Sequence, residues 1–577
     1  MDGPDLVIRG GTVVDGTGVE PRRADVAVAG DRIVAVGDVP DGSAEVVDAS
    51  GLLVTPGFVD IHAHYDGQAT WDQRMVPSSW HGVTTVVAGN CGVGFAPVHA
   101  ADHDRLIELM EGVEDIPGVT LHEGLAWNWS TFPEFLDALD GRRFDVDVAV
   151  HVPHAALRLH VMGERGANRE PATPEDIEAM GALAAEAVEA GAIGFSTSRT
   201  TNHRTSRGEP TPTLTASADE LVGIATAIGR TGKGVLQLVS DFVDVDAEFE
   251  LCRRMVIESG RPLSFSLLET PLRTWRRQLE LLAAANGDGL AIKAQVAPRA
   301  VGVLLGLDCT LNPFITNPVY RTIAGLPLDE RVRTMADPAF RTKLLDAERG
   351  DERGPAPARR RMFSDLSNIY ELADPPDYEP DPATSVAARA LREARDPLDL
   401  AYDLLLGDGG RAMLYLPFLN YGEGNLDAAR EMLVHPNTVV GLADGGAHVG
   451  TICDASFPTT LLAHWGRDRT HDLVDLPLLV QRQTSATARA VGLLDRGVLA
   501  PGYRADLNLI DFDRLVARRP EIRHDLPAGG RRLVQRADGY VATYVAGQRT
   551  YAGGREDGPL PGRLLRGPRP APVGRPS

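Results

Sequence analysis

The chain has 577 residues, more than one hydrophobic core normally supports, so we expect one large domain and at least one smaller one. Hydrophobic residues make up 43% and charged residues 24%, the balance of an ordinary globular protein rather than a disordered one. The formal charge of −22 disfavours nucleic acid and anionic membrane surfaces as partners, and four cysteines in so long a chain indicate free or metal-bound thiols rather than a disulfide framework.

Both ends of the chain are rich in short strand patterns. Residues 6–54 contain β-branched runs separated by Gly-Asp and Asp-Gly turns, which predict antiparallel hairpins, and residues 497–511 and 540–547 repeat this texture. Neither end can bury a core alone, so we expect residues 1–55 and 496–555 to form one small β-sandwich. The N-terminus lacks a basic secretory segment, and no run approaches ~20 apolar residues, which predicts a cytoplasmic protein without a membrane span.

Residues 56–495 alternate apolar runs with amphipathic helical stretches. After a first run that ends before His62, further runs occupy residues 84–89, 146–150, 192–196, 234–239, 262–266, 290–294 and 438–443. Buried parallel strands followed by helices, repeated eight times, predict a (β/α)₈ TIM barrel. Periodicity alone also allows an open doubly wound sheet.

Two stretches depart from this alternation. Residues 325–395 are charged and rich in Arg and Pro, which indicates an insertion that is either a lid over the barrel mouth or a solvated excursion. Residues 556–577 are rich in Gly, Pro and Arg, and their low apolar content predicts a flexible tail.

Side chains able to bind a metal follow several of the predicted strands. His62 and His64 close the first strand, Cys91 follows the second, and Asp444 ends the last. Each of them singly has a structural explanation, such as a buried thiol or a turn aspartate. Active-site groups of a TIM barrel gather at the carboxyl ends of its strands, and zinc accepts nitrogen, sulfur and oxygen donors. The combination therefore predicts a zinc site.

Four motifs resemble the amidohydrolase superfamily, and within it the D-aminoacylase (N-acyl-D-amino-acid deacylase) branch. They are residues 10–16 (GGTVVDG), 54–66 (VTPGFVDIHAHYD), 89–92 (GNCG) and 501–507 (PGYRADL). The resemblance implies a (β/α)₈ barrel with a small β-sandwich from both chain ends. It also implies zinc ligation by His62, His64 and Cys91, with Asp444 both as a ligand and as the general base toward the attacking water.

The chain departs from this branch at two positions. The branch has two further histidines, after the fifth and sixth barrel strands, and our alignment places Leu238 and Leu267 there. Because leucine cannot ligate, we expect a single metal ion, most simply Zn²⁺, held by the four ligands above, although another divalent ion fits as well. A carbamylated lysine bridging two metals is the other device of the superfamily, and Lys293 is the one barrel-strand candidate.

Further residues are candidates for catalysis or substrate binding: His448 for polarising a carbonyl or holding Asp444, and His154, Arg158, Gln237, Gln295 and Arg299 for contacts to substrate. Guanidinium groups suit a substrate carboxylate, but either arginine can equally pair with an acidic side chain of the chain itself. His448 can likewise serve only to satisfy loop carbonyls.

These observations predict a metal-dependent hydrolase of the non-peptide C–N bond of a small N-acyl amino acid or related amide. The metal would activate water and Asp444 would act as general base. The alternative is an amidohydrolase-fold protein with altered chemistry, such as a lyase, an isomerase or a cyclic-amide hydrolase, or a non-catalytic small-molecule binder. The expected partner is a small amide, with no nucleic acid and no membrane, and the resemblance allows a homo-oligomer.

Overall fold

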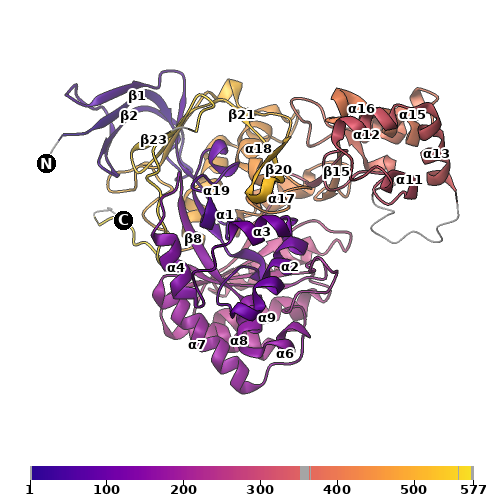
Figure 1. Ribbon diagram of the computed structural model, residues 1–577. Helices are drawn as coiled ribbons and strands as arrows, with labels where there is room; N and C mark the ends of the chain where they lie inside the picture. Colours follow the sequence, from indigo (N-terminus) through magenta and orange to yellow (C-terminus); the bar gives the residue numbers. More distant parts are fainter. Residues whose placement is uncertain (1–2, 351–362, 364, 557, 574–577) are drawn as a thin grey trace.

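The computed structural model describes residues 3–350, 363, 365–556 and 558–573. A barrel wrapped by helices carries a β-sheet unit on one side and a helical unit on the other, and both chain ends lie near the sheet unit (Figure 1). The predicted arrangement of a barrel and a separate sheet domain is confirmed.

The barrel has eight parallel strands in the order β16-β12-β11-β10-β9-β8-β7-β6. They are β6 (Phe58–Asp60), β7 (Val83–Ala88), β8 (Asp147–Pro153), β9 (Gly194–Arg199), β10 (Val235–Ser240), β11 (Leu263–Leu267), β12 (Ile292–Val296) and β16 (Thr438–Val440). A parallel bridge between Ala63 and Gly445 joins the first strand to the last. The sheet is therefore a nearly closed barrel rather than an open doubly wound sheet.

Helices cover the outside of the barrel and its two ends. They are α1 (Gln68–Trp71), α2 (His103–Glu114), α3 (Gly118–Gly124), α4 (Phe132–Asp140), α5 (His154–Met162), α6 (Glu164–Ala167), α7 (Pro174–Ala190), α8 (Ala218–Arg230), α9 (Val245–Ser259), α10 (Trp275–Gly287), α17 (Asp427–Val434), α18 (Phe457–Ala463), α19 (Leu476–Gln483) and α20 (Ser485–Ala490). Local sequence sets their starts: Thr173 forms a capping box with Asp176 before α7, and the Ser217 hydroxyl accepts a hydrogen bond from Glu220 N before α8.

The sheet unit joins strands from both chain ends, in the order β23-β22-β17-β5-β1-β2-β3 with β4 beside β1. Its strands are β1 (Leu6–Val13), β2 (Arg22–Ala29), β3 (Arg32–Gly37), β4 (Glu45–Asp48), β5 (Leu53–Pro56), β17 (Leu507–Ile510), β22 (Tyr540–Val545) and β23 (Gln548–Ala552). Strand β1 pairs in parallel with β4 and β5, so the N-terminal part is not made of hairpins alone.

Part of the segment assigned to the sandwich, residues 496–555, lies elsewhere. Strands β18 (Val516–Ala517) and β21 (Ala537–Asp538) pair only with each other, and the hairpin of β19 (Glu521–Leu526) and β20 (Gly530–Val534) lies beside α3. Leu533 N donates to Val449 O over 2.6 Å. The apolar side chains of this hairpin join the barrel core, so it covers the carboxyl end of the barrel.

The insertion is longer than the predicted 325–395. It runs from β13 (Val301–Gly306) to β15 (Met413–Leu419), with β14 (Tyr370–Glu371) and the helices α11 (Pro318–Arg321), α12 (Leu328–Met335), α13 (Pro338–Arg349), α15 (Val386–Arg392) and α16 (Pro397–Gly410). It has its own hydrophobic core and projects from the barrel (Figure 1). Its two long strands, β13 and β15, are apolar runs that resemble barrel strands in sequence. Residues 351–362 and 364 of the predicted segment lie outside the described residues.

The expected flexible tail is wrong for the described part of residues 556–577. Leu565 N donates to Val148 O over 2.7 Å, and Phe144 N donates to Gly562 O over 3.0 Å. Leu564 and Leu565 are each 4% exposed. Although the segment has a low apolar content, its two buried leucines and its main-chain hydrogen bonds to β8 and the residues before it hold it against the barrel. Residues 557 and 574–577 lie outside the described part.

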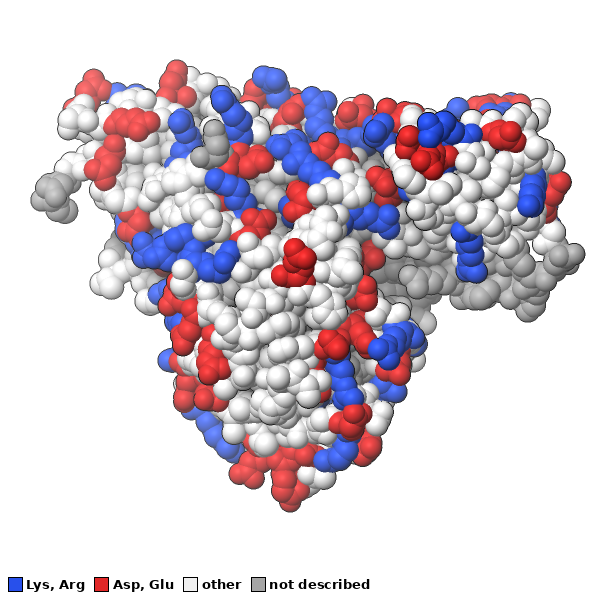
Figure 2. All heavy atoms as spheres, in the orientation of Figure 1, with Lys and Arg blue, Asp and Glu red and all other residues white. Residues whose placement is uncertain are grey.

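Acidic and basic side chains alternate over the face drawn in Figure 2 rather than forming one large patch of a single sign. Among the described residues, no helix combines the length and apolar character needed to cross a bilayer.

Candidate metal centre

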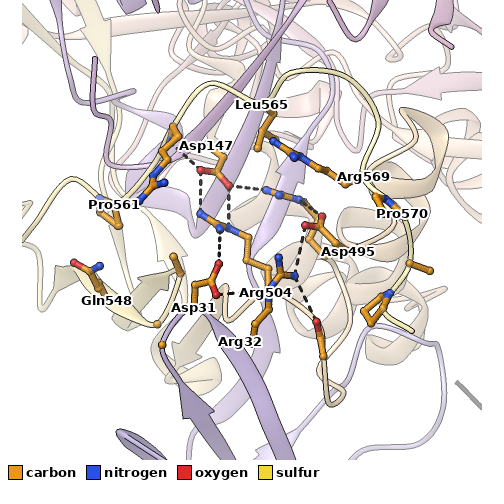
Figure 3. Close-up of a pocket in the computed structure, with 18 of the residues that line it drawn as sticks. Asp31, Arg32, Asp147, Asp495, Arg504, Gln548, Pro561, Leu565, Arg569 and Pro570 are labelled. Carbon is orange, nitrogen blue, oxygen red and sulfur yellow. Dashed lines mark hydrogen bonds and ion pairs between the residues drawn. The ribbon is translucent and has the colours of Figure 1, made fainter. Parts of the chain in front are cut away.

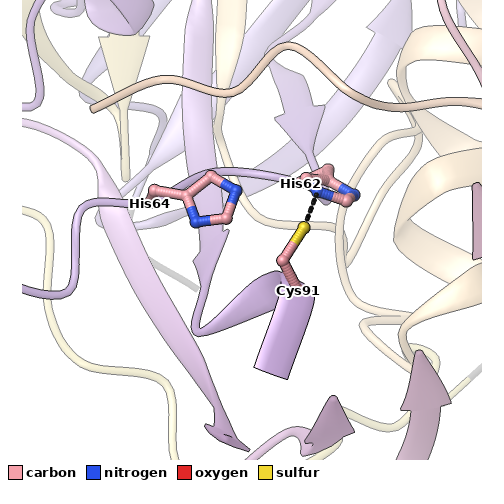
Figure 4. Close-up of side chains that lie close together, drawn as sticks. All are labelled: His62, His64 and Cys91. Atoms are coloured by element: carbon pink, nitrogen blue, oxygen red, sulfur yellow. Dashed lines mark hydrogen bonds between the residues drawn. The ribbon is translucent and has the colours of Figure 1, made fainter. Parts of the chain in front are cut away.

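Two histidines and a cysteine converge at the carboxyl end of the barrel (Figure 4). Strand β6 ends at Asp60, so His62 and His64 lie just beyond the strand rather than on it, and Asp60 Oδ1 accepts a hydrogen bond from His62 N. His62 Nε2 lies 3.2 Å from Cys91 Sγ. Within the described residues, these three form the one group of three His, Cys, Asp or Glu side chains close enough to share an ion.

Asp444 lies beside the two histidines and comes from the opposite end of the chain. Its Oδ1 lies 3.4 Å from His62 Nε2 and 3.6 Å from His64 Nε2. Main-chain bonds hold it there, because Asp444 N donates to His62 O and His64 N donates to Gly445 O. Asp444 Oδ1 is buried without a hydrogen-bond partner among the described residues.

The spacing of these donors fits a metal ion. Metal–ligand distances of about 2.0–2.3 Å for zinc correspond to tetrahedral edges of about 3.3–3.8 Å between neighbouring donors. The observed separations of 3.2, 3.4 and 3.6 Å lie close to that range, and the orphaned Asp444 Oδ1 calls for a cation. The site therefore fits a divalent metal with nitrogen, sulfur and oxygen ligands.

A strained turn presents the Cys91 thiol to this group. Cys91 has a positive φ of 57° between two glycines that also have positive φ. Asn90 Nδ2 donates to Val87 O, and Cys91 N donates to Gln237 Oε1 over 3.1 Å. Burial raises the pKa of Cys91 to about 12, so ionisation of the thiol depends on a cation beside it.

The outer nitrogens of the two histidines have different partners. Gln295 Oε1 lies 2.6 Å from His62 Nδ1, and Gln295 Nε2 donates to Ser264 Oγ. Glu114 Oε1 lies 3.1 Å from His64 Nδ1. Both partners direct Nε2 toward the centre, the arrangement common around protein metal sites. Gln295 is thus a support for a metal ligand rather than a substrate contact.

Glu114 was missed in the sequence. Glu114 is the last residue of α2. A negative charge is unfavourable at the C-terminal end of a helix dipole, and this unusual position was the one sequence signal that it has a special role. Burial lowers the pKa of His64, but the Glu114 carboxylate together with the neighbouring Asp444 and Cys91 outweighs burial and raises the pKa well above its usual range. Burial likewise raises the pKa of Asp444, but the neighbouring imidazoles of His64 and His62 reverse this and hold the pKa below its usual range.

The lumen-facing positions near the ends of β10 and β11 differ from those expected. Gln237 faces the lumen, so strand alternation turns Leu238 outward, and Leu267 likewise follows an inward serine, Ser266. Leu238 and Leu267 therefore face away from the lumen, and neither lines the metal centre. The lumen positions are held by Val239 and Ser266, and neither is an imidazole.

Arg158 and His154 are engaged away from the metal centre. Arg158 Nη1 lies 2.7 Å from both carboxylate oxygens of Glu220, and Nη2 donates to Glu170 O. His154 Nε2 lies 2.9 Å from Glu220 Oε1, and Nδ1 lies 2.8 Å from Thr197 Oγ1. This buried network joins α5 to α8, so neither predicted substrate contact is free.

Arg299 is also committed within the protein. It is 1% exposed, pairs with Asp454 at 3.0 Å and lies over the Tyr378 ring at 3.6 Å. Burial raises the pKa of Asp454 to about 7. The arginine joins the insertion to the loop after β16 rather than facing a substrate.

His448 lies on the turn that carries Asp444. Its φ is 50°, its side chain is 26% exposed, and Nε2 is 3.8 Å from Glu114 Oε2. Lys293 faces the other end of the barrel, where Nζ donates to Pro436 O and Asn437 Oδ1 just before β16. A lysine bridge between two metals is therefore not built from Lys293.

A cavity of about 1070 Å³ lies away from this centre, between the sheet unit, the amino end of the barrel and the C-terminal segment (Figure 3). Arginines and aspartates that line it pair with each other: Asp147 Oδ2 lies 2.8 Å from Arg496 Nη1 and 2.9 Å from Arg504 Nε. This network fastens the three parts together. Beside Asp444 a cavity of about 20 Å³ remains under Leu533, room for one water molecule.

Comparisons with known proteins identify the family of the chain. A sequence profile described as Amidohydrolase family matches residues 45–551. The N-acyl-D-glutamate deacylase of Alcaligenes xylosoxydans xylosoxydans is 37% identical over 520 residues, covering 89% of this chain and 88% of its own. The N-acyl-D-aspartate deacylase of that organism is 28% identical over 574 residues, covering 97% and 95%.

The solved structure of a D-aminoacylase, described as having a binuclear metal centre, matches with a TM-score of 0.64 and 25% identity over 98% of this chain and 100% of its own. The predicted fold and reaction class are thereby confirmed. The chain belongs to the Amidohydrolase family, as a metal-dependent hydrolase of carbon–nitrogen bonds other than peptide bonds.

Proposed function

We propose that this protein hydrolyses the amide bond of a small N-acyl-D-amino acid, using one Zn²⁺ ion held by His62, His64, Cys91 and Asp444. The observation that carries the proposal is the cluster of His62, His64 and Cys91, with Asp444 Oδ1 3.4 Å and 3.6 Å from the Nε2 atoms of the two histidines. A single ion is favoured because the lumen positions on β10 and β11, Val239 and Ser266, lack the imidazoles of a second site.

Zinc supplies Lewis acidity that polarises the amide carbonyl and lowers the pKa of a water molecule. Asp444 acts as the general base: its carboxylate accepts the proton of the attacking water and returns it to the leaving nitrogen. The low pKa of this carboxylate keeps it ionised at neutral pH, as a base must be. With its side chain 18% exposed, Asp444 is also more accessible than His62 or His64.

The D configuration and the free carboxylate of the substrate are proposed from the deacylases named above, which carry them in their names. Arg158 and Arg299 are committed to internal carboxylates and cannot bind the substrate carboxylate without breaking buried ion pairs. Gln237 Nε2 is buried without a partner among the described residues and lies on the residue that supports Cys91. We assign it, with His448, to polar contacts with the substrate.

Dialysis against a chelator followed by Zn²⁺ addition tests this proposal, with N-acetyl derivatives of paired D- and L-amino acids as substrates. Asp444→Asn should lower kcat by about 10²–10⁴-fold, while Asp513→Asn, an exposed aspartate, should leave it unchanged. Activity indifferent to both the metal and Asp444→Asn contradicts the mechanism. Hydrolysis confined to L-substrates contradicts the substrate class.

A further inference from the structure

Glu114 lies between two histidines of the metal centre. It is 1% exposed, and its two carboxylate oxygens face different rings: Oε1 is 3.1 Å from His64 Nδ1, and Oε2 is 3.8 Å from His448 Nε2. Oε2 has no hydrogen-bond partner in the described part of the chain. A buried carboxylate at a helix C-terminus is destabilised both by desolvation and by the helix dipole. A favourable local interaction must therefore offset this cost.

We propose that Glu114 is a positioning residue that fixes the orientation of His64 for metal binding and anchors His448 on the same carboxylate. The inference rests on the proposed metal centre. His64 Nδ1 lies 3.1 Å from Oε1 without a well-directed hydrogen bond among the described residues. The carboxylate favours the proton on Nδ1, which leaves the Nε2 lone pair toward the centre, 3.6 Å from Asp444 Oδ1.

The two histidine ligands are therefore supported unequally. His62 Nδ1 faces the neutral amide of Gln295, whereas His64 Nδ1 faces a carboxylate. A carboxylate partner raises the basicity of an imidazole ligand more than an amide does, so His64 is the stronger donor of the pair.

The second carboxylate oxygen of Glu114, Oε2, faces the turn after Asp444. Val449 N donates to Glu114 O over 3.3 Å, and the neighbouring Asp115 Oδ2 accepts a hydrogen bond from Gly450 N over 3.2 Å. The end of α2 and residues 449–450 are thus joined by one main-chain bond and one bond to a side chain. His448 Nε2 lies 3.8 Å from Oε2, an ion-pair rather than a hydrogen-bond distance, so Glu114 faces both a proposed metal ligand and the turn after Asp444.

Zinc affinity of the purified full-length protein, measured by competition with a chromogenic chelator, tests the contact with His64. Glu114→Gln keeps the shape and removes the charge, and should weaken zinc binding about 10–100-fold. Glu111→Gln is the matched control, because Glu111 lies one turn earlier on α2 and bonds only to Gly118 N. Equal zinc affinity in wild type and Glu114→Gln overturns the inference; a wild type that binds no zinc overturns the proposed metal centre instead.

Thermal unfolding of the metal-free proteins shows whether Glu114→Gln folds. If Glu114→Gln does not fold, the zinc affinity of Glu114→Asp is measured instead. Its shorter side chain draws the carboxylate away from His64 Nδ1, so we expect weaker zinc binding. Unchanged zinc affinity overturns the inference. A double-mutant cycle with His448→Asn tests the contact with His448. The loss of kcat caused by His448→Asn should be smaller in the Glu114→Gln background, and full additivity overturns the anchoring of His448.

Discussion

Gln295 Oε1 lies 2.6 Å from His62 Nδ1 while Gln295 Nε2 donates to Ser264 Oγ over 2.8 Å, so one amide joins a lumen serine to a metal-binding histidine. Gln295→Leu keeps the volume and removes the acceptor. We expect zinc affinity to fall about 10–100-fold, because the His62 ring loses its orientation. Gln278→Leu, at a buried glutamine of α10, is the control, and zinc binding at wild-type strength in Gln295→Leu contradicts the assignment.

Arg158 should prove structural rather than substrate-binding. Arg158→Ala leaves Glu220 as an unpaired buried charge, and we expect a loss of about 3–5 kcal/mol in the free energy of unfolding, seen as a lower midpoint in thermal unfolding. The double variant Arg158→Met with Glu220→Leu should be less damaging than the single one. A raised KM with an unchanged unfolding midpoint in Arg158→Ala would restore the substrate-binding role.

Glu379 should make stability depend on acid pH. Burial acts to raise its pKa, but hydrogen bonds from His464, Arg469 and Leu426 N outweigh burial and lower the pKa from 4.5 to about 2. A lowered carboxyl pKa contributes stability above the unfolded value, and this is lost as pH falls toward the folded value.

Wild type should therefore exceed Glu379→Gln in the free energy of unfolding by on the order of 3 kcal/mol at pH 6. That difference should shrink between about pH 4.5 and pH 2, where Glu379 takes up its proton. Denaturant unfolding of both proteins from pH 6 downward measures the gap. A gap that stays constant over this window excludes the ion-paired carboxylate as its source.

The C-terminal segment should stabilise the barrel. Leu565 shares a hydrophobic cluster with Val59, Val87 and Ala149 at the amino end of the barrel. Leu565→Ala should cost about 2–5 kcal/mol, measured by thermal unfolding. Pro568→Ala, at an exposed position of the same segment, is the control. Equal midpoints for Leu565→Ala and wild type would show that the segment does not contribute.

The barrel strands and the convergence of His62, His64 and Cys91 could be predicted because both depend on local signals. Buried parallel strands are short continuous apolar runs, and ligands follow where such runs stop. Which strand residues point into the lumen was harder to predict. Strand alternation alone does not say whether Leu238 points inward or outward, and only a contact such as that of Gln237 with Cys91 decides it.

Pairings across long separations were also out of reach. Arg158 meets Glu220 on another helix, and Arg299 meets Asp454 beyond the whole insertion. Each arginine looks in sequence like a free cation suited to a carboxylate substrate. Only the folded structure shows that each arginine is paired with a carboxylate of the chain itself rather than being available to a substrate.

The join between the first and last barrel strands bears on how the protein is made. The bridge between Ala63 and Gly445 crosses it, with His62 and His64 on one side and Asp444 on the other. During synthesis the early ligands leave the ribosome long before Asp444 does, and domains generally fold as units. The proposed ligand set is incomplete until the chain has grown past residue 444. We therefore expect metal loading to be a late event that coincides with closure of the barrel.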